Sequence, residues 1–129
     1  MFLDIGANQG LYSLIAATNP KCRKVISLEP VKETFDLLNF NIIHNNATSI
    51  ITPVCAGLSD TAGTAHISVY PGHSGLASLK HQSDPKFQRP IKLHDMQSLD
   101  DLIPDAWPII VKVDVEGHED VVIPLLLKS

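Results

Sequence analysis

Two repeats of strand, turn and helix are visible in the first half of the chain. Residues 1–5 form a short apolar run, residues 24–28 form a second, and after each run apolar side chains recur at helical spacing. These helical positions are Leu11, Leu14 and Ile15, then Val31, Phe35, Leu38 and Ile42. Residues 49–55 supply a third strand that is rich in β-branched side chains. Three strands separated by two helices predict an α/β fold with a parallel sheet.

The second half of the chain has a weaker pattern. Residues 57–60 predict a turn, and residues 64–70 alternate like an exposed strand. Residues 71–90 predict a long surface loop, because Gly, Ser, His, Gln and Pro are frequent there. Residues 91–94 and 109–113 predict two further strands.

Two more helices are expected in this half. Ser98 is expected to cap a short helix that ends at Leu102. The acidic side chains that follow residue 113 suit the first turn of a final helix, because negative charge is favourable near a helix N-terminus. Pro124 is expected to kink or end that helix.

The composition supports a single aliphatic core. Of the 129 residues, 44% are hydrophobic and only 5% are aromatic, a balance typical of parallel α/β sheets. We therefore expect residues 1–129 to form one domain. The net charge is −4 and the Lys and Arg residues are scattered, so nucleic acid is not expected as a ligand.

Metal and membrane sites are not predicted. Cys22 and Cys55 lie outside any CxxC pattern, and the six histidines have no paired ligand spacing. The apolar runs are far shorter than the roughly 20 residues that span a bilayer, and the first residues do not resemble a signal peptide. The sequence leaves the compartment open, with the cytoplasm as the default.

The turn over residues 6–10 joins the first strand to the first helix, where a glycine-rich backbone can approach a ligand closely. A dinucleotide fingerprint needs further glycines at positions that hold Asn8 and Leu11 here. Asp4 would repel a pyrophosphate and suits an ammonium group, directly or through water. The turn therefore favours a ligand with an amino-acid tail, and a tight turn without a ligand is the alternative.

Glu29 ends the second strand and stands 19 residues after Gly10. This is close to the spacing at which an acidic residue binds the two hydroxyls of a ribose; a solvated acid at a strand end is the alternative. Together with the glycine turn, Glu29 indicates a ligand with a ribose at one end and an amino-acid tail at the other. S-adenosylmethionine has this shape.

Three segments, residues 2–10, 28–30 and 111–119, resemble motifs of the FkbM family of methyltransferases. The third, with the pattern Lys-hydrophobic-Asp-hydrophobic-Glu-Gly, is the most specific to that family. The resemblance implies a Rossmann-like, doubly wound class I methyltransferase fold with a mostly parallel sheet and S-adenosylmethionine as cofactor. It also implies methylation of an oxygen, typically a hydroxyl of a small molecule or a glycan.

The resemblance also implies which residues bind the cofactor. They belong to the glycine turn, to the end of the second strand and to a loop that would approach the adenine. The implied cofactor-binding residues are Asp4, Gly6, Asn8, Gly10, Glu29, Ser59 and Asp60.

Asp114, Glu116 and His118 are the candidate catalytic residues. Asp114 and Glu116 follow the fourth central strand, where open parallel sheets bind their ligands. A hydroxyl is a weak nucleophile, so a general base is expected, and His118 and Glu116 are the alternatives for that role. In a purely structural interpretation, Asp114 caps the final helix and the other acids favour its dipole.

Two other functions are alternatives to a methyltransferase. One is a non-catalytic domain with the methyltransferase fold. The other is a nicotinamide-dependent oxidoreductase, which Asn8 and Leu11 disfavour.

By the resemblance, the domain is cut short at both ends and its parallel strands have the order third, second, first, fourth. Residues 109–113 would then form an exposed outer strand through which copies of the chain self-associate.

Overall fold

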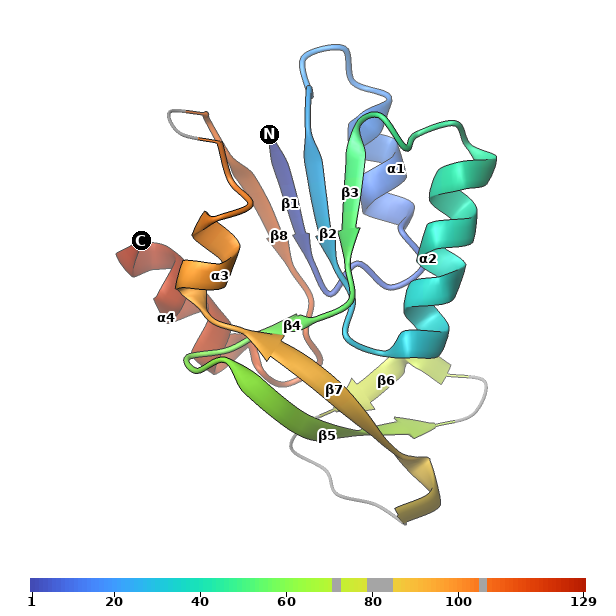
Figure 1. The fold of residues 1–129 in the computed structure, drawn as a ribbon, viewed down its shortest axis with the longest axis vertical. Coiled ribbons are helices and arrows are strands. Elements are labelled where there is room, and N and C mark those ends of the chain that lie inside the picture. Colours follow the sequence, from blue (N-terminus) through green and yellow to red (C-terminus); the bar gives the residue numbers. More distant parts are fainter. Residues whose placement is uncertain (71–72, 79–84, 105–106) are drawn as a thin grey trace.

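The chain folds into two sheets, with helices on both faces of the first (Figure 1). The computed structural model describes residues 1–70, 73–78, 85–104 and 107–129. The elements in chain order are β1 (Phe2–Ile5), α1 (Leu11–Ala17), β2 (Val25–Leu28), α2 (Lys32–His44), β3 (Ile51–Val54), β4 (Gly57–Leu58), β5 (Gly63–Tyr70), β6 (His73–Ser78), the 3₁₀ helix η1 (Pro85–Phe87), β7 (Gln88–His94), α3 (Met96–Asp100), β8 (Ile110–Val113) and α4 (Glu119–Lys128).

The first sheet is parallel and has the strand order β3-β2-β1-β8. This confirms the expected order and the Rossmann-like fold class. The register places Leu3 of β1 beside Ile26 of β2 and Val111 of β8. All strands of this sheet run the same way, so their carboxyl ends meet at one edge, where open α/β sheets bind ligands.

Alternation along the strands supplies a core on each face of the first sheet. Ile26 points into a core that also holds Leu99 of α3 and Val122 of α4. Its neighbour Val25 points the opposite way and packs with Leu38 of α2. Helices α1 and α2 cover this second face, and α3 and α4 lie across the sheet from them (Figure 1). Burial on both faces explains why the strands are almost continuously apolar.

The second sheet has the order β4-β7-β5-β6 and lies beyond the carboxyl ends of the parallel strands (Figure 1). Strand β7 is parallel to β4 and antiparallel to β5. A small core of Val31, Ile67 and Ile91 joins this sheet to the segment before α2. The second sheet therefore closes one side of the space beyond the strand ends.

Two segments that the sequence predicted as turn or loop contain strands. The expected turn at residues 57–60 begins with β4, whose Gly57 and Leu58 pair with the end of β7. The expected loop at residues 71–90 contains β6, η1 and the start of β7, while its residues 71–72 and 79–84 lie outside the described residues. The predictions were wrong because β4 has only two residues and forms by pairing with the distant β7, and because β6 pairs with β5 in an irregular register, so neither strand shows a clear alternation in the local sequence.

The helix ends in the second half also differ from the expectations. Asp95, and not Ser98, caps α3. Asp95 Oδ1 accepts hydrogen bonds from the main-chain N–H of Ser98 at 2.9 Å and from Ser98 Oγ at 2.8 Å. Pro124 does not end α4, which continues to Lys128. Packing of Val122 and Leu126 on the core holds the helix through the proline.

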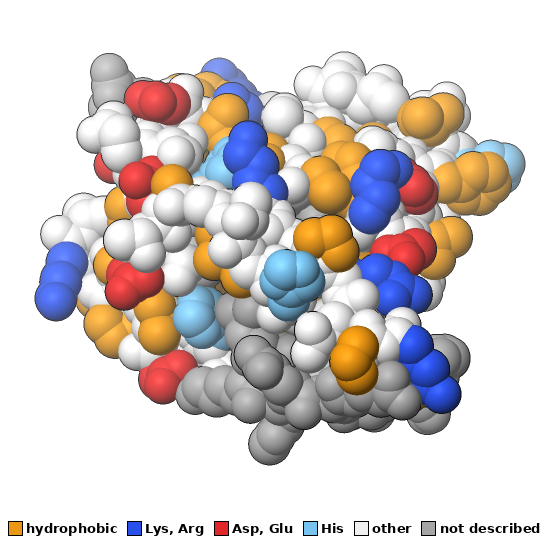
Figure 2. All heavy atoms as spheres, turned by 60° about the horizontal axis from the view of Figure 1, so that its bottom comes forward, with side chains coloured by type: hydrophobic (Ala, Val, Ile, Leu, Met, Phe, Trp, Pro, Cys, Tyr) orange, Lys and Arg blue, Asp and Glu red, His pale blue; other side chains and the backbone are white. Residues whose placement is uncertain are grey.

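Charges of both signs are spread over the side of the molecule formed by the second sheet. Lys and Arg side chains stand apart from one another, among acidic and apolar ones (Figure 2). The described side chains on this side show no continuous basic stripe. Within the described ranges, no helix combines the length and the apolar stretch needed to cross a bilayer.

Candidate functional site

A cavity lies at the carboxyl edge of the parallel sheet, between the strand ends and the second sheet. The turn after β1, the segment after β2 and the loop after β8 supply its polar groups, and β4, β5 and β7 supply much of its apolar wall. The lining residues are Ile5, Gly6, Asn8, Glu29, Pro30, Val31, Gly57, Leu58, Ile67, Ile91, Leu93, Asp114, Val115, Glu116 and His118.

The turn after β1 has a backbone that requires glycine at its start. Gly6 has a φ of +78°, and a Cβ there would lie 1.8 Å from the carbonyl oxygen of Asp114. Any other residue would therefore push the turn away from the loop after β8. Asn8 follows with a φ of +52°, a conformation that asparagine tolerates better than most residues. The turn and the loop after β8 thus meet in main-chain contact.

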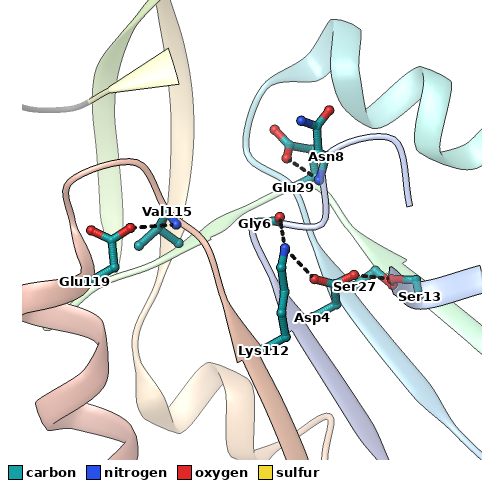
Figure 3. Close-up of polar contacts among 9 residues, drawn as sticks. All are labelled: Asp4, Gly6, Asn8, Ser13, Ser27, Glu29, Lys112, Val115 and Glu119. Atoms are coloured by element: carbon teal, nitrogen blue, oxygen red, sulfur yellow. Dashed lines mark hydrogen bonds and ion pairs between the residues drawn. The ribbon is translucent and has the colours of Figure 1, made fainter. Parts of the chain in front are cut away.

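Glu29 holds the turn to the start of α2. Its Oε2 accepts a hydrogen bond from the N–H of Asn8 at 2.9 Å (Figure 3). Its Oε1 accepts one from the N–H of Val31 at 3.0 Å. The side chain lines the cavity and is only 7% exposed. Burial raises the pKa of Glu29 above its ordinary value of 4.5, while the two N–H donors and Lys112 lower it. Each oxygen keeps a lone pair for a ligand hydroxyl.

Asp4 lies behind the turn and is fully buried. Its Oδ2 accepts a hydrogen bond from Ser13 Oγ at 2.6 Å, and Ser13 Oγ also lies 2.7 Å from Ser27 Oγ. Its Oδ1 forms an ion pair with Lys112 Nζ at 3.0 Å (Figure 3). Sequence reasoning missed Lys112, although a charged residue inside the apolar run 109–113 was a signal.

The loop after β8 carries the candidate catalytic residues and is held from behind by Glu119. Glu119 Oε1 accepts a hydrogen bond from the N–H of Val115 at 3.2 Å, and Oε2 accepts one from the N–H of Gly117 at 2.9 Å. Glu116 has a φ of +45°, a sparsely populated conformation for this residue type. The pKa of Glu116 is raised from 4.5, first by partial burial and then by Asp114 and Glu119.

The start of α4 corrects the structural interpretation of Asp114. The helix begins at Glu119 with His118 at its N-cap, so Asp114 precedes the helix and does not cap it. The N–H of Asp114 instead extends the pairing of β8 with β1 by bonding to the carbonyl of Ile5 at 2.9 Å. His118 Nε2 lies 3.2 Å from Ser59 Oγ, and that hydroxyl donates to Asp60 at 3.1 Å.

The cavity brings together six of the residues that the sequence singled out. These are Gly6, Asn8, Glu29, Asp114, Glu116 and His118. Four others do not line it: Asp4, Gly10, Ser59 and Asp60. Asp4 lies behind the turn, Gly10 is the N-cap residue before α1, and Ser59 contacts His118, which lines the cavity. Of the loop 58–60 that the resemblance implied near the adenine, Leu58 lines the cavity, as does Gly57 directly before it.

The polar part of the cavity is acidic. Within the described part of the chain, Glu29, Asp114 and Glu116 line it and no Lys or Arg does. Asn8 Oδ1 is buried and has no hydrogen-bond partner among the described residues, so it is available to a ligand donor. This set of hydrogen-bond acceptors fits S-adenosylmethionine, which carries a sulfonium and an ammonium, better than it fits a pyrophosphate. No group of three or more metal-ligating side chains occurs among the described residues.

Comparison with known proteins agrees with the fold and the motifs. The structure is similar to the crystal structure of a methyltransferase FkbM from Methylobacillus flagellatus KT, with a TM-score of 0.60 and 24% identity over 95% of this chain and 27% of that one. The sequence is 27% identical to methyltransferase sdnD of Sordaria araneosa, over 91% of this chain and 56% of that protein. It is 33% identical to the hexuronic acid methyltransferase AglP of Haloferax volcanii, over 90% of this chain and 45% of that protein.

The chain thus spans about half the length of these two curated relatives. A comparison with family profiles matches the methyltransferase FkbM domain to residues 4–124. The match includes the turn after β1, Glu29 and the loop after β8. This chain belongs to the FkbM family of methyltransferases.

Proposed function

We propose that residues 1–129 act as one methyltransferase domain that uses S-adenosylmethionine to methylate a hydroxyl of a small molecule or a glycan. The observation that carries the cofactor assignment is the acidic cavity at the carboxyl edge, with Glu29, Asp114 and Glu116 in its lining and no described Lys or Arg. Such a cavity favours a cationic ligand. Family membership supplies the class of reaction.

A glycan is a suitable acceptor class because one relative is a hexuronic acid methyltransferase. When bound, S-adenosylmethionine supplies a methyl group on a positively charged sulfur. The residues of this chain then have two tasks. They align the acceptor hydroxyl with that methyl group, and they accept the proton of the hydroxyl. Alignment of reactants alone can lower a barrier by about 7–11 kcal/mol.

Two other functions are weaker candidates. A nicotinamide-dependent oxidoreductase has to bind a pyrophosphate, which the three carboxylates of the cavity disfavour. A non-catalytic domain with this fold would keep the cavity without turnover. Assays with a labelled methyl donor and candidate glycans separate this last function from an active enzyme.

Calorimetric titration with S-adenosylhomocysteine tests the cofactor assignment. The wild-type chain should bind, and Glu29→Gln should weaken binding by about 1.5–3 kcal/mol, the range for hydrogen bonds to a charged group. Glu33→Gln is the matched control, because Glu33 is exposed and pairs with Arg89 away from the cavity lining. Its affinity should equal that of the wild type.

A second ligand tests the electrostatic argument directly. Sinefungin carries an amine in place of the methylated sulfur, so it should bind more tightly than S-adenosylhomocysteine, whose sulfur is neutral. The proposal would be overturned if the chain bound NADH but neither sinefungin nor S-adenosylhomocysteine.

A further inference from the structure

We infer that Lys112 is a positioning residue. The Asp4 carboxylate holds its ammonium, and the ammonium fixes the Gly6 carbonyl. This contact also fixes the turn after β1, which forms one wall of the cofactor cavity. The inference rests on the proposed function and goes beyond it. It assigns the charged residue of β8 a role toward the cofactor without contact with the cofactor.

The geometry of Lys112 places its ammonium between two segments of the chain. Its Nζ lies 2.7 Å from the Gly6 carbonyl oxygen and 3.0 Å from Asp4 Oδ1 (Figure 3). The same ammonium lies 5.3 Å from the ring centroid of Tyr12 in α1, within range of a cation–π contact. The side chain is 20% exposed, whereas the Asp4 side chain is 0% exposed. Lys112 therefore joins β8 to the turn after β1 at the inner end of the cavity.

Asp4 needs this ammonium inside the protein. A buried carboxylate without a partner is strongly unfavourable. Ser13 Oγ satisfies Oδ2, and Lys112 supplies the opposite charge at Oδ1. Both carboxylate oxygens thus face protein groups, and Asp4 does not line the cavity. We therefore assign Asp4 an indirect role: it holds Lys112, and it does not contact the ammonium of the cofactor.

The bond to Gly6 gives Lys112 a role beyond neutralising Asp4. The N–H of Gly6 donates to the carbonyl of Leu28 at 3.0 Å, and its carbonyl accepts from Lys112, so both peptide groups that flank the Gly6 Cα are held. The Gly6 Cα in turn packs against the carbonyl of Asp114, two residues after Lys112. The Lys112 ammonium thus sets the distance between the turn after β1 and the loop after β8, which carries the candidate catalytic residues.

Three variants of the full chain test the inference: Lys112→Met, Asp4→Asn and the double variant. Lys112→Met should lower the melting temperature, because it leaves the Asp4 carboxylate buried and unpaired. The double variant should recover most of that loss, because it removes both charges. Its affinity for S-adenosylhomocysteine should nevertheless stay roughly ten-fold or more below that of the wild type, because the Gly6 carbonyl has lost its charged donor.

Lys24→Met is the matched control. Lys24 Nζ also donates to a main-chain carbonyl, that of Leu102 at 2.9 Å, but neither residue lines the cavity. This variant should bind S-adenosylhomocysteine like the wild type.

The outcomes separate the inference from the proposed function. If the double variant recovers both melting temperature and affinity, Lys112 merely neutralises Asp4 and the positioning role is wrong. A second outcome also contradicts the positioning role: the double variant recovers stability, but Lys24→Met loses as much affinity as the double variant. The loss of affinity would then be a general effect of removing a lysine. If the wild-type chain itself does not bind, the proposed function fails first.

Discussion

Carboxylates around the cavity have two kinds of surroundings. Glu29 and Glu119 each accept hydrogen bonds from two main-chain N–H groups, so both stabilise the loops that form the cavity. Glu116 differs, because no hydrogen bond to its carboxylate occurs among the described residues and its backbone has a positive φ. Strained residues of this kind cluster at functional sites. We therefore propose Glu116 as the carboxylate that interacts with an acceptor.

We predict that Glu116→Gln lowers kcat by about 100- to 10,000-fold, the usual contribution of a general base. Affinity for S-adenosylhomocysteine should fall far less than kcat, because the sulfur of this compound is neutral. Because the pKa of Glu116 is raised above 4.5, the wild-type rate should fall as the pH drops through that raised value and the base becomes protonated. The measurement is methyl transfer from a labelled donor to a candidate glycan acceptor over a range of pH.

His118→Gln provides the comparison, because His118 is the other candidate base in the cavity. A large loss of kcat in His118→Gln together with near-normal turnover in Glu116→Gln would assign the proton transfer to the histidine.

The register of the strands decides which side chains meet. Residue 4 of β1 lies beside residue 112 of β8, and this alignment puts the carboxylate and the ammonium on the same face of the sheet. A shift of one residue would bring Val111 or Val113 opposite Asp4 and turn Lys112 to the other face. The pairing of β1 with β8 is therefore as important to the site as the residues themselves.

Helix α3 offers a test of stability against pH. The bonds from the N–H and the Oγ of Ser98 lower the pKa of Asp95 below its ordinary value of 3.8. The stability that Asp95 contributes is therefore complete above the unfolded value and is lost as the pH falls through the lower folded value. Asp95→Asn keeps a good capping residue without the ionisation. Urea unfolding should show less loss of stability in this variant than in the wild type between about pH 5 and pH 2.

Asp95→Ala completes this comparison, because it removes the cap itself. It should be less stable than Asp95→Asn at every pH. Identical pH profiles for the wild type and Asp95→Asn would show that the capping bonds do not depend on the charge.

On the scale of the whole molecule, the edge of the parallel sheet at β8 stands out. Among the described strands, β8 pairs with β1 alone. Ile110 is 69% exposed, and Ile109 and Val111 are each 40% exposed. An apolar edge of this kind is a template for pairing with another chain. Self-association through β8 therefore stays a prediction of the fold.

We predict that the chain forms oligomers through this edge and that Ile110→Lys weakens them, because a lysine on an edge strand opposes pairing. Leu127→Lys is the matched control: Leu127 is 81% exposed on α4 and does not belong to the sheet edge. Size-exclusion chromatography with light scattering should show a lower mass for Ile110→Lys only. A monomeric wild-type chain, or equal masses for both variants, would contradict the role of the edge.

Local periodicity in the sequence was enough to predict the strands and helices of the first half and the strand at 109–113, whereas residues 114–118, whose acids were expected in the first turn of the final helix, form a loop before it. The strands and helices of the first half each bury an apolar face whose spacing is visible within a few residues. Resemblance to family motifs predicted the strand order, and six of the fifteen described residues that line the cavity were among the site residues singled out from the sequence. Only the tertiary structure decided that β4 and β6 are strands and that Asp4 faces Lys112. It also decided that Glu29 and Glu119 brace the loops. The pairing of β4 with β7, the ion pair of Asp4 with Lys112 and the bond from Asn8 to Glu29 join segments far apart in the chain, and they depend on how the sheets pair and pack.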